Sequence, residues 1–179
     1  MSDDLPALEE AIWQELARAT RDRGHAWRFA VLATVDGEAA DARTVVLRDT
    51  DRATRTLLIY TDARSPKAAQ LTAHPLGTLV LWSPQLSWQL RLRVRLALET
   101  SGLRVSSRWA QLKLTPAAQD YLSPLPPGSP LAAAAPERQS REHFAVLAAE
   151  VLSLDWLLLA ATGHRRARFD AAGAAWVTP

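Results

Sequence analysis

The segment Arg64-Ser65-Pro66-Lys67 combines residue types that could hold a phosphate group. Ser65 suits the N-cap of a helix, Pro66 its first position and Lys67 its second, ahead of the helical run 68–71. The free N–H groups of that helix start and the lysine ammonium would face one spot, which favours an anion. An ordinary helix start is the alternative, but only two of the 21 basic residues are lysines, so a lysine at this position is informative.

Two apolar strands lead into this helix start. Residues 44–47 form an apolar, β-branched run flanked by two arginines, and residues 56–60 form a second such run. Turn-forming residues at 49–51 separate the runs, which predicts a hairpin. An earlier apolar run over 29–35 ends in Asp36-Gly37, a turn signal, so we expect three consecutive strands to form a meander.

Hydrophobic spacing predicts the remaining elements. Strands are expected over 78–82, 88–99, 153–160, 164–170 and 174–178, and helices over 5–21, 65–71, 106–113, 116–122 and 137–151. Strand 88–99 alternates most clearly, and its polar face carries Gln89 and three arginines that we interpret as a solvated surface. Six or seven largely antiparallel strands with peripheral helices indicate a closed or partly closed β-barrel, because closure removes exposed strand edges.

Composition limits the classes of function. A chain of 179 residues is expected to form one domain over 1–179, with the proline-rich segment 123–136 as a surface loop. The absence of cysteine excludes disulfides, thiolate metal sites and cysteine nucleophiles, and the spacing of the histidines predicts no metal site. Nucleic-acid binding is not expected, because the net charge is only +2 and the arginine-rich segment 164–168 has no interleaved aromatic residues.

Neither end of the chain reads as a membrane segment. The N-terminal helix is amphipathic and follows acidic residues, which is unlike a signal peptide. The apolar run 151–162 is too short to span a bilayer and contains an aspartate. A cytoplasmic protein without membrane insertion is therefore expected.

Several of these residues occur in a characteristic order. The order Arg43-Thr44-Val45-Val46-Leu47-Arg48, Tyr60-Thr61-Asp62, Ser65-Pro66-Lys67, Pro75 and Gln89-Leu90-Arg91-Leu92 resembles the pyridoxamine 5'-phosphate oxidase family of FMN-binding split barrels. Farther on, Leu154-Asp155-Trp156 and His164-Arg165-Arg166-Ala167-Arg168-Phe169 are similar to that family's C-terminal signature. The resemblance covers roughly residues 27–179, and it implies a split β-barrel, FMN as the cofactor and a homodimer with the flavin at the subunit interface.

The resemblance also implies roles for residues of this sequence. It implies that FMN is bound by Arg43, Thr44, Val45 and Val46 along the ring, by Tyr60, Thr61, Ser65 and Lys67 around the phosphate, by Gln89 at the polar edge of the ring, and by Trp156 and Arg168 from the other subunit. Pro66 stands where the family carries an arginine, and only Arg64 is near enough in sequence to replace that charge.

The family's substrate residues are matched less well. Arg48 stands where the authentic oxidases carry a phosphate-binding lysine, and Arg165 and Arg166 lie near a missing Arg-Leu-His triplet. The family's Tyr, Arg and Ser substrate cluster is not found in the region 106–122. Such losses affect the substrate rather than the flavin.

We therefore expect an FMN-dependent oxidoreductase whose small-molecule substrate is other than, or poorly matched to, pyridoxamine 5'-phosphate. No catalytic residue is identified, since the redox chemistry belongs to the flavin. One alternative is a non-catalytic flavin-binding or sensor protein whose proline-rich segment contacts a partner. Another is a split barrel that binds haem or a deazaflavin.

Overall fold

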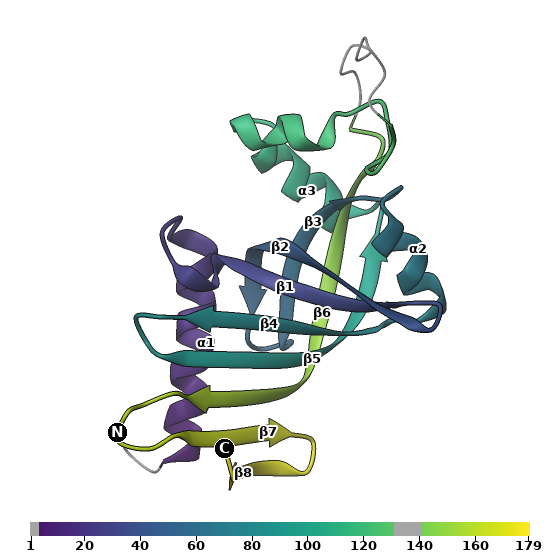
Figure 1. Ribbon diagram of the computed structural model, residues 1–179. Coiled ribbons are helices and arrows are strands. Elements are labelled where there is room, and N and C mark those ends of the chain that lie inside the picture. The colour runs from purple at the N-terminus through teal and green to yellow at the C-terminus, as the bar shows by residue number, and fades with distance from the viewer. Residues whose placement is uncertain (1–3, 131–140) are drawn as a thin grey trace.

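The fold is built around one antiparallel sheet of eight strands in the computed structural model, which describes residues 4–130 and 141–179 (Figure 1). The strands are β1 (Phe29–Asp36), β2 (Ala39–Asp51), β3 (Thr56–Asp62), β4 (Leu76–Ser83), β5 (Trp88–Glu99), β6 (Phe144–Leu158), β7 (Arg165–Asp170) and β8 (Gly173–Val177). They are ordered β3-β2-β1-β4-β5-β6-β7-β8, and an additional pairing of β3 with β6 closes six of them into a ring. This arrangement confirms the mainly β antiparallel barrel, to which β7 and β8 add a hairpin beyond the ring.

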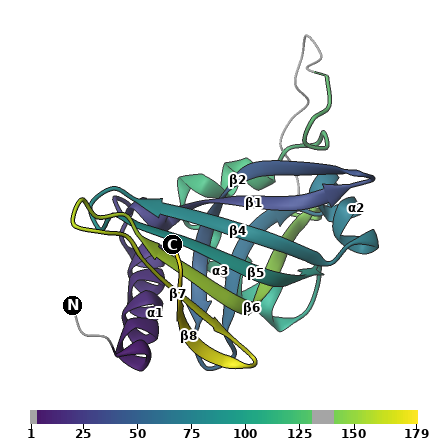
Figure 2. The same ribbon diagram turned by 60° about the horizontal axis from the view of Figure 1, so that its bottom comes forward.

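Helices surround the ring on separate sides. They are α1 (Leu5–Arg21), α2 (Pro66–Ala73) and α3 (Leu103–Leu112), with 3₁₀ turns η1 (Ala26–Arg28) and η2 (Pro116–Tyr121). Helix α1 lies along one side of the ring and α2 at the opposite side, as Figure 2 shows from a second direction. No helix in the described part of the chain is both long enough and apolar enough to cross a membrane.

Two apolar clusters hold these elements together. The larger fills the ring and continues to α1, whose Ile12 and Leu16 are fully buried with strand residues such as Leu32. The smaller lies outside the ring, where Leu58 of β3 and Phe144 of β6 pack under α3 and η2. Strands β3 and β6 are therefore covered on both faces.

This double coverage explains why the helix expected over 137–151 is wrong. Residues 137–140 lie outside the described part of the chain, but β6 begins at Phe144 and every residue from 144 to 149 is buried. A strand buried on both faces has an unbroken apolar run instead of an alternating pattern. The helical spacing of Phe144, Leu147 and Val151 is a coincidence within that run.

Smaller differences concern turns and loops. Strand β2 continues through the expected turn at 49–51, and the chain reverses at 52–55, where Arg55 adopts a positive φ of 49°. The helix expected over 116–122 is the 3₁₀ turn η2. In the proline-rich segment, 123–130 form neither helix nor strand, and 131–136 lie outside the described residues.

Candidate functional site

Helix α2 begins at the residues that the sequence singles out. Ser65 is its N-cap and Pro66 its first residue, but the serine side chain makes no capping hydrogen bond. The Ser65 hydroxyl instead lies 3.3 Å from the hydroxyl of Thr61, and both side chains are buried. The end of β3 and the start of α2 thus bring two hydroxyl groups together. Lys67 follows as the second residue of α2.

Lys67 is a half-buried cation without a fixed acceptor. Burial lowers the pKa of its ammonium, and the positive charge of Arg43 lowers this pKa further, against the opposing effect of Asp62 and Asp41. Within residues 4–130 and 141–179, the ammonium forms no hydrogen bond or ion pair. A negatively charged group beside the ammonium would favour its charged form and so offset the effect of burial.

Arg43 belongs to a network that fixes α2 against the strands. Its guanidinium donates to Gln70 of α2 at 3.1 Å and pairs with Asp41, while Gln70 also donates to Asp41 at 2.8 Å. The hydroxyl of Thr34 on β1 donates to Gln70 at 2.6 Å. Arg43 therefore uses donors on protein groups, and through Gln70 it holds α2 against the strands.

Arg64 is likewise engaged with protein groups. Its guanidinium pairs with Asp62 at 2.7 Å and donates to the carbonyl groups of Ser123 at 2.8 Å, Pro124 at 2.9 Å and Leu125 at 3.3 Å. Burial disfavours the charged form of Asp62, but hydrogen bonds from Arg64 outweigh that effect and lower the pKa of the carboxyl. The one residue able to replace the family's arginine at Pro66 therefore anchors the chain that follows η2.

The strand residues expected along the flavin divide between the two faces of β2. Val45 is buried inside the ring, whereas Thr44 is exposed and Val46 half-buried on the outside. Thr44 and Val46 lie beside Val31 and Phe29 of β1, which are exposed. Gln89 is half-buried on the outer face of β5, opposite the exposed Trp82 of β4. The outside of β1, β2 and β4 thus carries apolar side chains next to Gln89 of β5.

Trp156 does not share that outer face. Its ring is 0% exposed and packs in the core at 5.3 Å from the Trp88 ring and 6.2 Å from the Trp176 ring, centroid to centroid. Its indole nitrogen is buried and has no hydrogen-bond acceptor in the described structure. A fully buried ring has no surface to offer a ligand, so the contact with flavin that the resemblance implies for Trp156 has no support here. Arg168 is exposed on β7.

The three expected substrate residues lie in two separate places. Arg166 forms an ion pair with Asp155 at 2.7 Å, and Arg91 pairs with the same carboxylate. The Arg165 guanidinium lies 4.2 Å from the centre of the Trp176 ring. Arg48 lies on β2, where its guanidinium is 5.5 Å from the centre of the Tyr60 ring. One chain therefore does not assemble Arg48, Arg165 and Arg166 into a common site.

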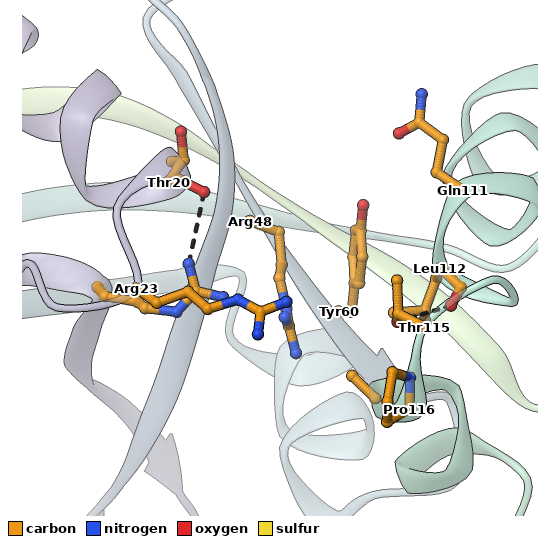
Figure 3. Close-up of a pocket in the computed structure, with 10 residues that line it drawn as sticks. Thr20, Arg23, Arg48, Tyr60, Gln111, Leu112, Thr115 and Pro116 are labelled. Atoms are coloured by element: carbon orange, nitrogen blue, oxygen red, sulfur yellow. Dashed lines mark hydrogen bonds between the residues drawn. The ribbon is translucent and has the colours of Figure 1, made fainter.

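Arg48 instead lines a cavity of about 490 Å³ between α1, β2, β3 and the α3–η2 region (Figure 3). Its other lining residues are Thr20, Arg23, Arg28, Tyr60, Gln111, Leu112, Thr115, Pro116 and Ala117. We call this the arginine pocket. Sequence reasoning missed Arg23 and Arg28, because arginine is the common cation of this chain and no local motif marks either residue.

The described residues contain no group of three or more histidine or acidic side chains that could hold a metal ion. Cationic and hydroxyl groups do gather at the start of α2 and in the arginine pocket. Both sites can bind an anion by charge-assisted hydrogen bonds.

Solved structures share this fold at low sequence identity. A pyridoxamine 5'-phosphate oxidase-related, FMN-binding protein from Nostoc punctiforme has 24% identity and a TM-score of 0.78, with 100% of both chains covered. PhzG from Burkholderia lata, in complex with tetrahydrophenazine-1-carboxylic acid, has 15% identity and a TM-score of 0.74, covering 97% of this chain and 92% of its own. ChuZ from Campylobacter jejuni has 10% identity and a TM-score of 0.65, and the match covers 98% of this chain and 64% of ChuZ.

No functionally curated protein matches the sequence. The model of one protein family, described as pyridoxamine 5'-phosphate oxidase, FMN-binding domain, matches residues 9–99. That match contains five of the six ring strands, β1 to β5, together with the start of α2. The chain therefore belongs to the family of the pyridoxamine 5'-phosphate oxidase FMN-binding domain.

Proposed function

We propose that the protein binds FMN and is an oxidoreductase that acts on a small molecule other than, or poorly matched to, pyridoxamine 5'-phosphate. The observation that carries the proposal is the half-buried Lys67 ammonium without an acceptor in the described structure, next to the buried hydroxyls of Ser65 and Thr61. These groups fit a phosphate, because a dianion gains most from charged and hydroxyl donors held on a rigid element.

The chain offers a surface for the ring as well as for the phosphate. Thr44 and Val46 would lie against the ring from the outer face of β2, and Gln89 would bind its polar edge. FMN supplies hydride-transfer chemistry when bound. The protein's part is to hold the phosphate at the start of α2 and to shield the ring with apolar side chains.

A homodimer would complete this site. The exposed apolar side chains of β1 and β4 are Phe29, Val31, Val35, Leu76 and Trp82, and we call this set the β1–β4 apolar face. A contiguous apolar patch bounded by charged residues is typical of an interface between protein chains. The arginines of β5 border the face on one side. A second copy related by a two-fold axis would cover the face and bring its own Arg168 to the flavin.

The contacts of the three expected substrate residues bear on whether pyridoxamine 5'-phosphate would fit. Arg165 and Arg166 are engaged with Trp176 and Asp155, so they do not offer a free pair of cations for a substrate phosphate. Arg48 lines the arginine pocket, whereas Arg165 and Arg166 line a different cavity beside Trp176. This distribution supports a substrate that differs from pyridoxamine 5'-phosphate.

The test is to purify the protein, record its visible spectrum and measure its affinity for FMN and for riboflavin. A flavin spectrum with FMN bound much more tightly than riboflavin is expected, because the start of α2 serves only a ligand that bears phosphate. Equal affinities would contradict the phosphate site. The spectrum of a haem or a deazaflavin would show that the cofactor is not FMN. If no candidate reductant reduces the bound FMN, the protein binds flavin without being an enzyme.

A further inference from the structure

Two of the cations near the start of α2 each have a carboxylate partner. Arg64 pairs with Asp62 at 2.7 Å, and Arg43 pairs with Asp41 of the same strand, β2. The Lys67 ammonium, by contrast, has no ion pair or hydrogen bond in the described part of the chain. Taken together, these five side chains carry one net positive charge.

The pair formed by Asp41 and Arg43 lies close enough to Lys67 to act on it. Gln70 follows Lys67 by three positions in α2, so the two side chains lie on neighbouring turns of one helix face. The Arg43 guanidinium donates to the Gln70 carbonyl oxygen at 3.1 Å, which places it beside that face. Burial lowers the pKa of the Lys67 ammonium, Arg43 lowers this pKa further, and Asp41 raises it. The charges of Arg43 and Asp41 therefore oppose each other where a phosphate would bind.

One oxygen of the Asp41 carboxylate, Oδ2, joins Asp41 to both neighbouring side chains. It accepts a hydrogen bond from the Gln70 amide at 2.8 Å and another from the Arg43 guanidinium. The bond from Gln70 lowers the pKa of the Asp41 carboxyl and outweighs desolvation, and Arg43 lowers this pKa further, so the carboxylate is ionised at neutral pH. The carbonyl oxygen of an asparagine can also accept two hydrogen bonds. The charge of Asp41 can consequently be removed while its hydrogen bonds are kept.

Thr34 of β1 supports the same network without a charge. Its hydroxyl accepts a hydrogen bond from the Arg43 guanidinium at 2.5 Å and donates one to the Gln70 carbonyl oxygen at 2.6 Å. The side chains of Thr34 and Gln70 are buried, which shields these bonds from water. The position of Arg43 and the orientation of α2 therefore depend on Thr34 as well as on Asp41, whereas the charge balance depends on Asp41.

We propose that Asp41 determines how strongly the start of α2 attracts a phosphate group, because it is the counter-charge of Arg43. While Asp41 is ionised, Arg43 adds little net charge to the site, and Lys67 supplies the attraction for an anion. A phosphate dianion would gain from a second net positive charge. Asp41 therefore weakens the site for phosphate while it helps to hold α2 in place. The identity of the phosphate as that of FMN rests on the proposed function, but the charge balance around Lys67 does not.

The first test is titration of the full-length, flavin-free variant Asp41→Asn with FMN and with riboflavin. The Kd for FMN should fall about threefold or more, because a second net positive charge then acts on the phosphate through partly exposed surroundings. The Kd for riboflavin should stay the same. Thr34→Val removes the bridging hydroxyl without changing any charge, so it should not tighten FMN. Asp120→Asn is the matched control, since Asp120 is exposed on η2 and its replacement changes the net charge equally.

The second test follows the charge balance without flavin. The chain has two lysines, so acetylation by N-hydroxysuccinimidyl acetate can be measured at each by mass spectrometry, with Lys113 as the internal reference for the reagent. Only the neutral amine reacts, so the pH dependence of the rate reports the pKa of Lys67. Asp41→Asn should move the Lys67 profile to lower pH, because Asp41 raises this pKa in the wild type. A loosened α2 would instead expose Lys67 to water and move the profile to higher pH.

Several results would overturn the proposal. Weaker or unchanged FMN binding in Asp41→Asn, or a Lys67 profile that stays or moves to higher pH, would show that Asp41 only holds α2. Equal changes in Asp120→Asn would assign them to the net charge of the molecule, and tighter FMN binding in Thr34→Val would assign them to the release of Arg43. If the wild type binds FMN and riboflavin equally, the proposed phosphate site fails, and the Lys67 profile alone then decides whether Asp41 balances Arg43.

Discussion

Replacing Lys67 with alanine tests the phosphate site most directly. The substitution removes the half-buried ammonium beside Ser65 and leaves the strands and the helix caps unchanged. A hydrogen bond to a charged group contributes about 1.5–3 kcal/mol, so the Kd for FMN should rise about 12- to 140-fold at 1.4 kcal/mol per tenfold.

The assay is titration of the flavin-free protein with FMN and with riboflavin, followed by quenching of flavin fluorescence. Lys113→Ala is a matched control, since Lys113 is the other lysine of the chain and is exposed at the end of α3. Riboflavin affinity should be the same in Lys67→Ala and wild type. Equal losses for FMN and riboflavin, or a flavin-free variant that unfolds at a much lower temperature, would show that Lys67 is structural and refute the reasoning.

Three further predictions concern the assembly, the substrate and the acid stability of the protein. Val31→Asp should convert the proposed dimer to a monomer at micromolar concentration in light scattering, because it places a charge in the β1–β4 apolar face, whereas Leu103→Asp on the exposed surface of α3 should not. A wild-type monomer would contradict the dimer. Oxidation of pyridoxamine 5'-phosphate, followed as pyridoxal 5'-phosphate formation, should show a kcat/KM about a thousandfold below that of an authentic oxidase, since two missing charge-assisted bonds at about 1.5–3 kcal/mol each lower kcat/KM by that order. Comparable turnover would show that the pocket arginines supply those bonds. The pKa of Asp62 is lowered by Arg64 in the folded protein, so its contribution to stability is present above the unfolded value of about 3.9 and is lost as pH falls through the lower folded pKa. The free energy of unfolding, measured with urea between neutral and acidic pH, should therefore fall less steeply with decreasing pH in Asp62→Asn than in the wild type. The same slope in both proteins would show that Asp62 does not contribute to acid sensitivity.

The sequence predicted elements well where one face meets water and the other meets the core. Strand β5 alternates between buried residues and Gln89, Arg91, Arg93 and Arg95, so its limits and faces follow from the pattern. Strand β6 is buried on both sides where α3 covers the ring, and this cover comes from residues far away in the chain. No local pattern could therefore separate that half of β6 from a buried helix.

The candidate site divides in the same way. The start of α2 could be predicted because the residue preferences of a helix start are local to Ser65 and Pro66, although the serine hydroxyl lies beside Thr61 and makes no capping hydrogen bond. The inward direction of Trp156 could not, because a shift of one residue moves a strand side chain to the opposite face, and here Asp155 is the outward residue. The meeting of Arg23 and Arg28 with Arg48 depends on how the α1–η1 segment packs against β2, which no spacing in the sequence reveals.

The pairing of β3 with β6 has a consequence for how the chain folds. It joins Thr56–Asp62 to Phe144–Glu150 and so closes a loop that contains α2, β4, β5 and α3. The entropy cost of closing a loop must be met before such distant contacts stabilise the chain, and topologies rich in them fold slowly. The residues that would hold the FMN phosphate begin at Thr61, near the end of β3 that this pairing secures. Cofactor capture should consequently follow ring closure in time, and bound FMN should slow the reopening of the β3–β6 seam.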